Sequence, residues 1–496
     1  MKYSSVSRLF VFSLFVTCSV WLCAAKSSFH LKNLCVEYAE TPLGIDVEKP
    51  RFSWQMAVPS DRRGGMQTAY QLTVTDEHGT QVWNSGKVIS DISLNIEYEG
   101  QSLKPVTRYI WTIRVWDNKG RNASASSWFE TGLMSRNDTD KIWGGAKWIG
   151  GGDEDQILHS QYLPIYRLDF TLQLDRQSAS TRAGFIYGAN DHRLMNKFKN
   201  IYHLQNAKDE SYVMMELDIT PLISGKEAQI NVYRVGYHPD DRKEAPLKSL
   251  IIPTSLINEN NKYEKHTVIL ISNYGITRLF IDDDQNEIGE VNLNPIGRSS
   301  DFITFPVVAD IGYSLPEGQS ATFSNIKIRH FQRPSNVIRV LNFDTSSGPF
   351  LTLDPSRNSM PMLRTRFVSE KQKVKKARLY VTSRGIYEIY MNGSRIGNDY
   401  FNPGLTQYNK MHLYQSYDVT DCIQEGDNVI GALLGEGWWS GGCTYMGELW
   451  NYFGDRQSLL AKLVVTYADG AEKVVVTNPS QWQYFSEGPI RYGSFF

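Results

Sequence analysis

Residues 103–115 read LKPVTRYIWTIRV, and an apolar side chain stands at every second position from Tyr109 to Val115. A period of two places every second side chain on the same face of a β-strand, so one face of this segment is apolar. Pro105 precedes the strand and favours a turn there. The segment therefore predicts a strand of an antiparallel sandwich that buries its aromatic and aliphatic side chains.

The sequence around this strand resembles the fibronectin type III fold. A turn at 117–120 (DNKG) and a second alternating segment at 126–131 follow it. Tyr109 then stands as in the tyrosine corner, and Trp54 is expected to be the buried tryptophan of an early strand. An unrelated sandwich with the same alternation is the alternative. Such a module is by default a spacer or docking platform and not a catalyst.

Short alternating segments such as 70–74 (YQLTV) recur between turns rich in Gly, Asn and Asp, and sustained helical periods are rare. We predict an all-β protein of tandem antiparallel β-sandwiches. The chain of 496 residues is long enough for about three domains. The predicted parts are a signal peptide at 1–25, a fibronectin type III-like domain at 26–136, a concanavalin- or laminin-G-like jelly roll at 137–335 and a galactose-binding-like jelly roll at 336–496.

The first 25 residues have the pattern of an export signal. Lys2 and Arg8 form a short positive region, residues 9–22 are mostly apolar, and 23–25 (CAA) supplies the small residues of a cleavage site. A membrane anchor needs about 20 apolar residues, more than this run offers. We expect an exported protein, periplasmic or extracellular, that begins near Lys26 and has no integral membrane segment after the signal is removed.

Basic and acidic residues nearly cancel, 52 against 53, for a formal net charge of −1. This balance gives no field that attracts nucleic acid, so no nucleic-acid partner is expected. The sequence has no zinc-hydrolase or P-loop motif. Cys422 and Cys443 are the pair to test for a disulfide, because an oxidising compartment permits one.

Residues 278–289 predict a β-hairpin with an acidic turn at 282–287 (DDDQNE). The acids alternate as in a calcium loop, but Glu287 stands where that loop needs Gly, and Leu293 stands where it needs Glu. We therefore expect a solvated turn.

Two segments, 164–170 (PIYRLDF) and 361–367 (PMLRTRF), share a pattern of Pro, two apolar residues, Arg, two further residues and Phe. Proline fits the first residue of a strand, where no ladder hydrogen bond is needed. Each segment is therefore expected to open one of two successive jelly rolls.

The third region contains three motifs in series, 385–393 (GIYEIYMNG), 401–408 (FNPGLTQY) and 434–441 (LGEGWWSG). The first ends in an Asn-Gly hairpin turn. In this order the motifs resemble the N-terminal β-sandwich module of bacterial α-L-rhamnosidases, glycoside hydrolase family 78. Residues 50–54 (PRFSW) and 147–150 (KWIG) are similar to the start of the same enzymes. The second region is then a β insertion found in some members.

The resemblance also implies where catalysis takes place. In that family an (α/α)6 barrel that follows the β modules hydrolyses terminal α-L-rhamnose from glycans with inversion, using two carboxylates. No helical pattern follows here, so we expect the N-terminal, non-catalytic part of such an enzyme, lacking the barrel. We assign no catalytic residue. Glu436 is the most suggestive carboxyl, but its flanking glycines favour a loop between strands.

Binding is the activity that the local sequence favours. Trp438 and Trp439 lie in a Gly-rich loop that can present one ring to a sugar, with Asn392 and Asn402 as hydrogen-bonding partners. Some modules that resemble this region bind rhamnose with calcium, and Asn392, Asp399 and Asn402 offer oxygen ligands for that ion. The alternative is that the tryptophans pack in the core and the asparagines form turns. No cofactor is expected to be required.

Three functions stay open from the sequence. The first is the carbohydrate-recognition and scaffold region of a secreted α-L-rhamnosidase, catalytically incomplete by itself, with a rhamnose-containing poly- or oligosaccharide as partner. The second is a free-standing extracytoplasmic carbohydrate-binding protein without hydrolase activity. The third is a structural spacer that neither binds nor hydrolyses sugar.

Overall fold

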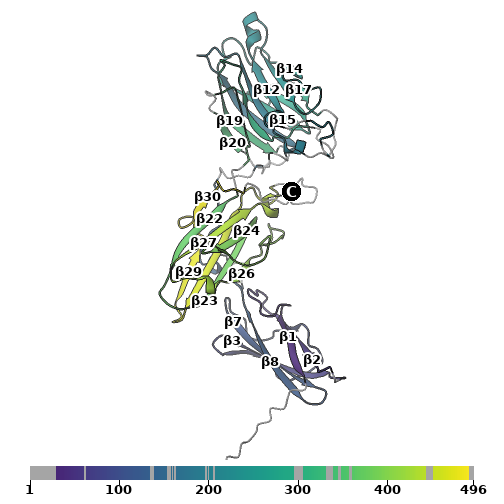
Figure 1. The fold of residues 1–496 in the computed structure, drawn as a ribbon, viewed down its shortest axis with the longest axis vertical. Coiled ribbons are helices and arrows are strands. Elements are labelled where there is room, and N and C mark those ends of the chain that lie inside the picture. Colours follow the sequence, from purple (N-terminus) through teal and green to yellow (C-terminus); the bar gives the residue numbers. More distant parts are fainter. Residues whose placement is uncertain are drawn as a thin grey trace, which may run out of the picture. The chain divides into compact units, whose positions relative to one another are not determined.

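The structure is a computed structural model of the chain. It describes residues 29–60, 63–134, 139–152, 158, 160, 163–195, 198, 200–204, 207–294, 305–330, 339–343, 348–356, 360–442 and 451–490. The chain divides into two compact units, residues 1–137 and 138–496. Strands dominate both units (Figure 1), which confirms the predicted all-β class. The predicted signal peptide and Cys443 lie outside the described residues.

Helix is scarce in the described part of the chain. Its two α-helices, α1 (Thr139–Ile142) and α2 (Gly437–Ser440), have four residues each. None of the described helices is long and apolar enough to cross a membrane.

The first unit is a sandwich of two antiparallel sheets. One sheet has the order β1-β2-β6, and the other has the order β4-β3-β7-β8 with β5 on β3. The strands are β1 (His30–Val36), β2 (Arg51–Ala57), β3 (Gln67–Asp76), β4 (Gln81–Asn84), β5 (Val88–Ile89), β6 (Ile96–Glu97), β7 (Arg108–Asp117) and β8 (Asn122–Glu130).

Two predictions for this sandwich are confirmed. The Tyr109 hydroxyl accepts a hydrogen bond from the Lys104 backbone N–H at 2.8 Å, which is the tyrosine corner. Trp54 on β2 is fully buried, and its indole N–H donates to the Gln67 side-chain oxygen at 2.9 Å. The bond satisfies a polar group that would otherwise be costly to bury.

The second sandwich consists of two six-stranded antiparallel sheets, β17-β16-β15-β10-β19-β20 and β14-β13-β12-β11-β18-β21. One continuous apolar core lies between them. The strands are β10 (Ile165–Leu174), β11 (Arg182–Ala189), β12 (Tyr212–Asp218), β13 (Gln229–Val235), β14 (Lys248–Ile251), β15 (His266–Asn273), β16 (Ile276–Ile281), β17 (Glu287–Asn292), β18 (Asp310–Ser314), β19 (Ala321–His330), β20 (Arg339–Phe343) and β21 (Phe350–Leu353).

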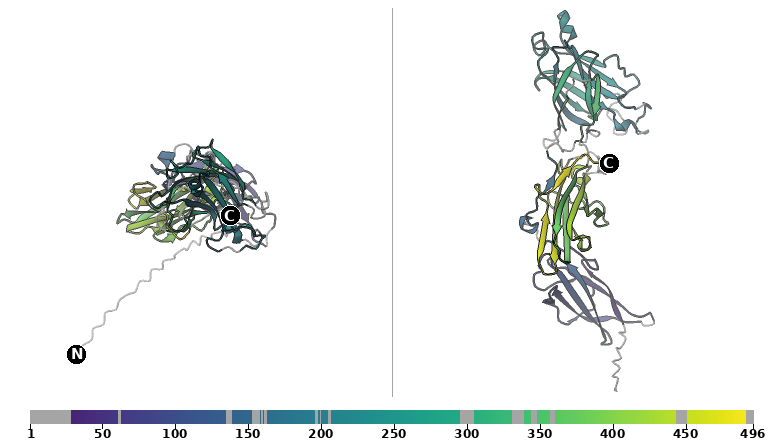
Figure 2. Two further views of the ribbon diagram at one scale, coloured as in Figure 1. Left: turned by 90° about the horizontal axis from the view of Figure 1, so that it is seen from above. Right: turned by 60° about the vertical axis from the view of Figure 1, so that its left-hand side comes forward.

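The third sandwich pairs the sheets β25-β24-β27-β22-β30 and β26-β23-β28-β29 around its own core. The layers of each sandwich can be followed in Figures 1 and 2. The strands are β22 (Met362–Ser369), β23 (Val374–Arg384), β24 (Ile386–Met391), β25 (Ser394–Arg395), β26 (Gln415–Asp418), β27 (Gly426–Gly435), β28 (Ser458–Tyr467), β29 (Glu472–Val476) and β30 (Gln483–Phe485).

A short strand that precedes the second sandwich in sequence belongs to the third. β9 (Ile149–Gly150) pairs with β28, and the Lys462 ammonium donates to the Ile142 carbonyl at 2.7 Å. At the other end, β20 and β21 lie beyond residue 335, the boundary expected from the sequence, and pair with β19 and β18. The second sandwich is therefore inserted between β9 and β22.

The repeated motif and the acidic hairpin are found where the sequence placed them. β10 and β22 begin immediately after Pro164 and Pro361, and each is the first long strand of its sandwich. β16 and β17 form the expected hairpin. Residues 282–285 of its turn are exposed, as expected of a solvated turn, and Asp284 pairs with Arg167 at 2.8 Å.

Candidate functional site

The outer face of the sheet β25-β24-β27-β22-β30 carries the clearest binding geometry of the third sandwich. Along β22 burial alternates, so Leu363 and Thr365 face the core while Met362 and Arg364 face outward. The same alternation turns Tyr390 outward on β24. The outward side chains of four strands therefore form one surface.

Strand register sets four residues in one row across this surface. Tyr390 pairs with Gly431, Gly431 pairs with Arg364, and Arg364 pairs with Gln483. Gly431 has no side chain, so a gap lies in the row between the tyrosine ring and the arginine.

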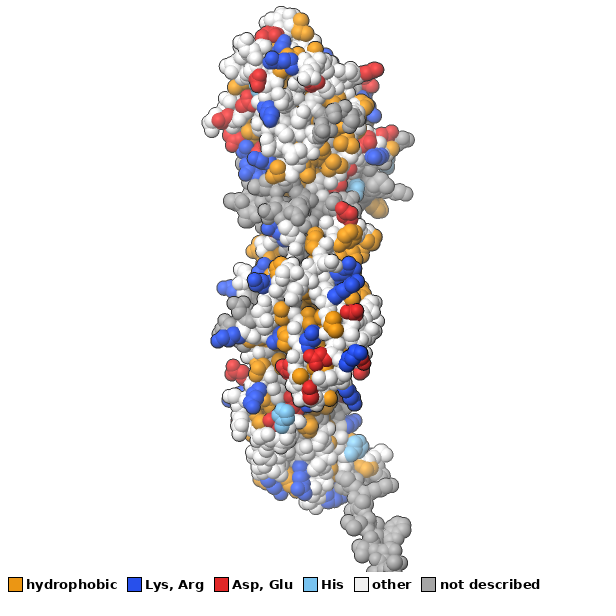
Figure 3. Space-filling view, turned by 90° about the vertical axis from the view of Figure 1, so that its left-hand side faces the viewer, with side chains coloured by type: hydrophobic (Ala, Val, Ile, Leu, Met, Phe, Trp, Pro, Cys, Tyr) orange, Lys and Arg blue, Asp and Glu red, His pale blue; other side chains and the backbone are white. Residues whose placement is uncertain are grey.

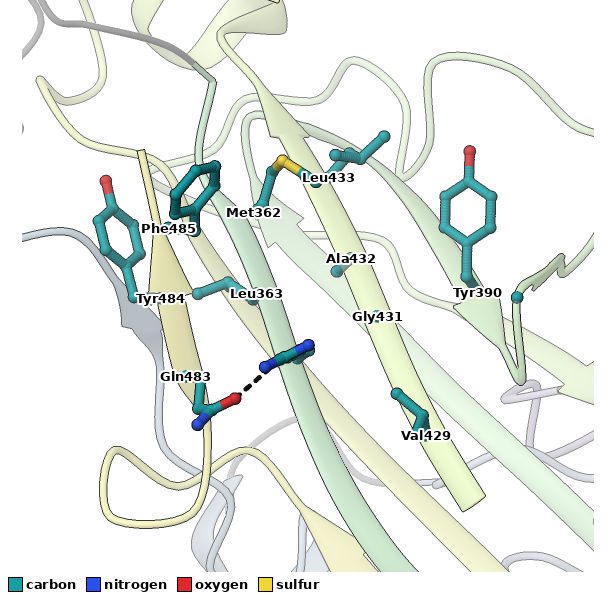
Figure 4. Close-up of a pocket in the computed structure, with 12 residues that line it drawn as sticks. Met362, Leu363, Tyr390, Val429, Gly431, Ala432, Leu433, Gln483, Tyr484 and Phe485 are labelled. Atoms are coloured by element: carbon teal, nitrogen blue, oxygen red, sulfur yellow. Dashed lines mark hydrogen bonds between the residues drawn. The ribbon is translucent and has the colours of Figure 1, made fainter. Parts of the chain in front are cut away.

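This gap is part of an open groove of about 940 Å³. The volume falls within the range of small-molecule sites, about 300–1,000 Å³. Tyr390 and Phe485 stand on opposite sides of β22 and β27, as Figure 4 shows. Phe485 is 51% exposed on the short strand β30. The groove thus has aromatic walls and a floor of strand backbone.

Polar side chains hold the groove residues in place. The Tyr390 hydroxyl donates to the Glu388 carboxylate at 2.6 Å, and this hydrogen bond, together with burial, raises the pKa of Tyr390. Glu388 also pairs with Arg395 at 3.4 Å. Arg364 Nε donates to the Gln483 side-chain oxygen at 2.7 Å, the dashed line in Figure 4.

Of the residues nominated from sequence, Asn392 forms the expected hairpin turn between β24 and β25. Its amide nitrogen donates to the Cys422 carbonyl and to Asn428 Oδ1, both at 2.9 Å. Its amide oxygen accepts the Val429 backbone N–H at 2.8 Å. The side chain therefore joins β24 to β27, and its amide is fully engaged.

Asn402 and Asp399 lie on the loop after β25. The Asn402 amide donates to the Tyr417 hydroxyl at 3.1 Å, and its backbone carbonyl accepts the Tyr387 N–H at 2.9 Å. Asp399 is exposed, and its backbone carbonyl accepts a hydrogen bond from Arg395. Asn402 thus anchors the loop, whereas the Asp399 carboxylate faces solvent.

The oxygen ligands nominated for calcium are two asparagines and one aspartate. Within the described residues there is no group of three or more His, Cys, Asp and Glu side chains that could hold a metal ion. The Asn392 oxygen is already an acceptor for Val429. Calcium at Asn392, Asp399 and Asn402 stays a prediction for titration.

A second oxygen-rich cluster, which the sequence did not suggest, lies in the second sandwich. The Asn190 amide donates to Asp310 at 2.9 Å and to Asp209 at 3.3 Å. The Thr352 hydroxyl donates to Asp209 at 2.5 Å. These hydrogen bonds tie the end of β11 to β18 and β21.

The two tryptophans of the Gly-rich loop differ. Trp439 packs among Tyr408 and Phe453, with ring centroids 5.7 and 6.2 Å away, and its indole N–H donates to the Arg456 carbonyl at 2.9 Å. Trp438 is half-buried and meets Phe401, itself 54% exposed, at 6.2 Å. Trp439 is thus a packing residue, and Trp438 is the better placed of the two for a ligand.

Glu436 is fully buried at the start of α2. Gly437 has a φ of +49°, and a Cβ atom there would meet Ile386 at 2.6 Å, so the glycine is required by the chain path. A general acid must reach the leaving-group oxygen. The geometry therefore favours the structural interpretation of this loop.

The fold and the groove define a class, a protein of serial antiparallel β-sandwiches with a sugar-sized groove on one sheet face. Residues 372–496 match the family described as "Alpha-L-rhamnosidase N-terminal domain". Residues 31–135 match the family described as "Rha78A-like, N-terminal immunoglobulin domain". Two of the three sandwiches therefore match domain families described from the N-terminal part of α-L-rhamnosidases.

Individual α-L-rhamnosidases are also similar to this chain. The chain is 31% identical over 485 residues to an α-L-rhamnosidase of Streptomyces avermitilis, covering 94% of this chain and 42% of that protein. It is 40% identical over 155 residues to an α-L-rhamnosidase of an Alteromonas species, covering 30% of this chain and 16% of that protein. The chain therefore spans about two-fifths of the length of its Streptomyces relative.

A solved structure shows the same arrangement of strands. The crystal structure of the Streptomyces avermitilis α-L-rhamnosidase complexed with L-rhamnose superposes with a TM-score of 0.53 at 25% identity. The match covers 94% of this chain and 42% of that one. It confirms the predicted series of sandwiches.

The groove residues Arg364, Tyr390, Gly431 and Gln483 were missed from sequence. One signal was present, because an isolated glycine within the strand 428–434 (NVIGALL) indicates a close approach or a binding site. The partners of Gly431 were hidden, because strand register and not sequence distance brings Gln483 beside Arg364.

Proposed function

We propose that this chain is the carbohydrate-recognition and scaffold region of an exported α-L-rhamnosidase and does not itself hydrolyse glycosides. The observation that carries the proposal is the 31% identity to an α-L-rhamnosidase across 94% of the chain. Two of its sandwiches also match N-terminal domain families of these enzymes.

The geometry supports a binding role more than a catalytic one. Inverting hydrolysis needs two carboxyl groups about 6.5–9.5 Å apart across a sugar. The groove of the third sandwich has no carboxylate among its lining residues. It has aromatic rings instead, whose faces suit the C–H surface of a pyranose.

The proposed partner is a rhamnose-containing oligo- or polysaccharide, and the proposed destination is periplasmic or extracellular. Export is tested by N-terminal sequencing of the protein recovered outside the cytoplasm. A start near Lys26 supports a cleaved signal, and a start at Met1 contradicts it.

Two assays on the 496-residue chain test the function itself. With p-nitrophenyl α-L-rhamnopyranoside we expect no release above the uncatalysed rate, and turnover in the usual enzyme range of about 1–10³ per second would contradict the proposal. Titration calorimetry with rhamnose-containing oligosaccharides, neutral and acidic, with and without calcium, should detect binding. No heat in either condition would contradict the recognition role.

A further inference from the structure

We propose that the groove over Gly431 binds an anionic oligosaccharide, whose successive rings lie along the groove from Tyr390 to Phe485 and which presents a carboxylate or sulfate to Arg364. The inference rests on the proposed function and adds a location and a ligand class to it. Three features of the outer sheet face carry it.

The first feature is a glycine that the fold does not require. Gly431 is not among the glycines with positive φ, and a Cβ atom there would meet nothing closer than 3.8 Å. Glycine within a strand is unfavourable by roughly 0.5–1 kcal/mol relative to alanine. The neighbouring outward residues of β27, Val429 and Leu433, do carry side chains. The absence of a side chain at Gly431 therefore leaves room above the sheet. Neither the backbone conformation nor the packing of β27 requires glycine there.

The second feature is the pair of aromatic walls. Tyr390 is held by its hydrogen bond to Glu388, so its ring does not need to be ordered when a ligand binds. Phe485 is half-exposed beside Met362, its cross-strand partner. Both rings offer apolar surface to the C–H face of a sugar.

The third feature is the charge of the groove. Arg364 is the one charged side chain among its twelve lining residues. Among the described residues, the Arg364 side chain makes one hydrogen bond, from Nε to the Gln483 side-chain oxygen. A guanidinium has five N–H donors, and the remaining ones suit a two-oxygen contact with a carboxylate or sulfate. Figure 3 shows basic, acidic and hydrophobic side chains together on one face of this sandwich.

Together these features select an acidic ligand over a neutral one. A neutral sugar would use the aromatic walls and leave the arginine solvated. An anionic sugar uses the walls and the arginine. The groove lining has no carboxylate, and the Glu388 carboxylate beside Tyr390 is engaged by Tyr390 and Arg395.

The test is titration calorimetry on the full 496-residue chain with matched ligands. The ligands are a rhamnose–uronic acid disaccharide, its carboxyl-reduced counterpart, and a sulfated rhamnose disaccharide. We expect at least one anionic ligand to bind about ten-fold tighter than the carboxyl-reduced one. The preferred anion identifies its source as a uronate or a sulfate ester. Equal affinity for all three ligands overturns the inference.

Two variants and one control locate the site. Arg364→Gln should abolish the preference for the anion. Arg366→Gln, at the next outward position of β22 but outside the groove lining, should keep it. Gly431→Val should remove binding without lowering the thermal midpoint, because a Cβ atom there meets nothing closer than 3.8 Å and valine favours strands. Full anion preference in Arg364→Gln overturns the inference.

The neutral ligand separates this inference from the proposed function. Binding of neutral rhamnose oligosaccharides that none of the variants alters leaves the recognition role intact and rejects the groove. Absence of binding to every saccharide rejects both.

Discussion

The second and third sandwiches begin with the same seven-residue pattern, and its arginine has a different role in each. Arg167 on β10 pairs with Asp169 at 2.7 Å and Asp284 at 2.8 Å, and its side chain is 13% exposed. Arg364 on β22 is exposed and donates to the neutral Gln483. One arginine is neutralised within the fold, and the other keeps its charge beside a groove. The shared motif thus places each arginine at the same position of the first long strand of its sandwich. The residues that distant segments bring beside each arginine decide its role.

The final phenylalanine of the motif has the same role in both sandwiches, because it packs in the core of each. Its removal should have the largest effect on stability. Phe170 is buried and stacks on Phe185 at 4.1 Å, and Phe367 is buried in the third core. Either substitution by Ala should cost about 3–5 kcal/mol through the lost transfer free energy and the cavity.

Scanning calorimetry checks this prediction, since each variant should lower the transition of its own sandwich. The exposed substitution Val368→Ala is a control within the same strand, expected to stay within about 0.5 kcal/mol. Equal, small losses in all three variants would refute the assignment of the motif to the two cores.

Substitution of the two arginines should have the next largest effect, and the loss of stability should differ between them. Arg167→Met leaves Asp169 and Asp284 without their partner, and we expect a loss of about 1–3 kcal/mol. Arg364→Met removes an exposed side chain and should change stability by less than about 0.5 kcal/mol.

Urea unfolding followed by hydrogen exchange of the β10 and β22 amides measures both effects. A stability loss at Arg364 as large as the loss at Arg167 would mean that both arginines are structural. That result would remove the contrast between the two sandwiches.

The smallest expected effect concerns the acidic turn that holds Arg167. His266 is buried, and although burial lowers its pKa, hydrogen bonds to Asp282 and to the Asn261 carbonyl raise it above the ordinary value of about 6.5. A raised pKa in the folded state means that the protonated pair stabilises fully below the unfolded pKa. This contribution is lost as the pH rises through the folded pKa.

Unfolding of the second sandwich measured from pH 6 to pH 9 should therefore show a decline in stability that His266→Gln abolishes. His78, on a turn of the first sandwich, is the control position. A decline that persists in His266→Gln would assign it to another group.

Local chemistry made much of the fold predictable. The alternation of 109–115, the tyrosine corner and the Asn392-Gly393 turn are properties of short segments, and each was found as expected. The insertion of the second region was expected from the family resemblance and not from local chemistry. Ile149 pairs with Leu459, and no local pattern reports a strand pair that spans an entire domain.

The site was less predictable for the same reason. The sequence drew attention to Trp439 and Asn392, because aromatic and amide side chains near glycines suit sugars. Packing engages both in the fold. The groove depends on a side chain that is missing at Gly431 and on the register of β27, β22 and β30. Register is set by pairing between distant segments and cannot be read from any one of them.

The most direct test of the central claim is a crystal structure of the chain grown with the acidic rhamnose-containing disaccharide. We predict a sugar ring over Gly431, in the groove that runs from Tyr390 to Phe485, with a carboxylate or sulfate of the ligand on Arg364. A sugar bound at the Trp438–Phe401 loop with the groove empty, or crystals without bound sugar at saturating ligand, would contradict it.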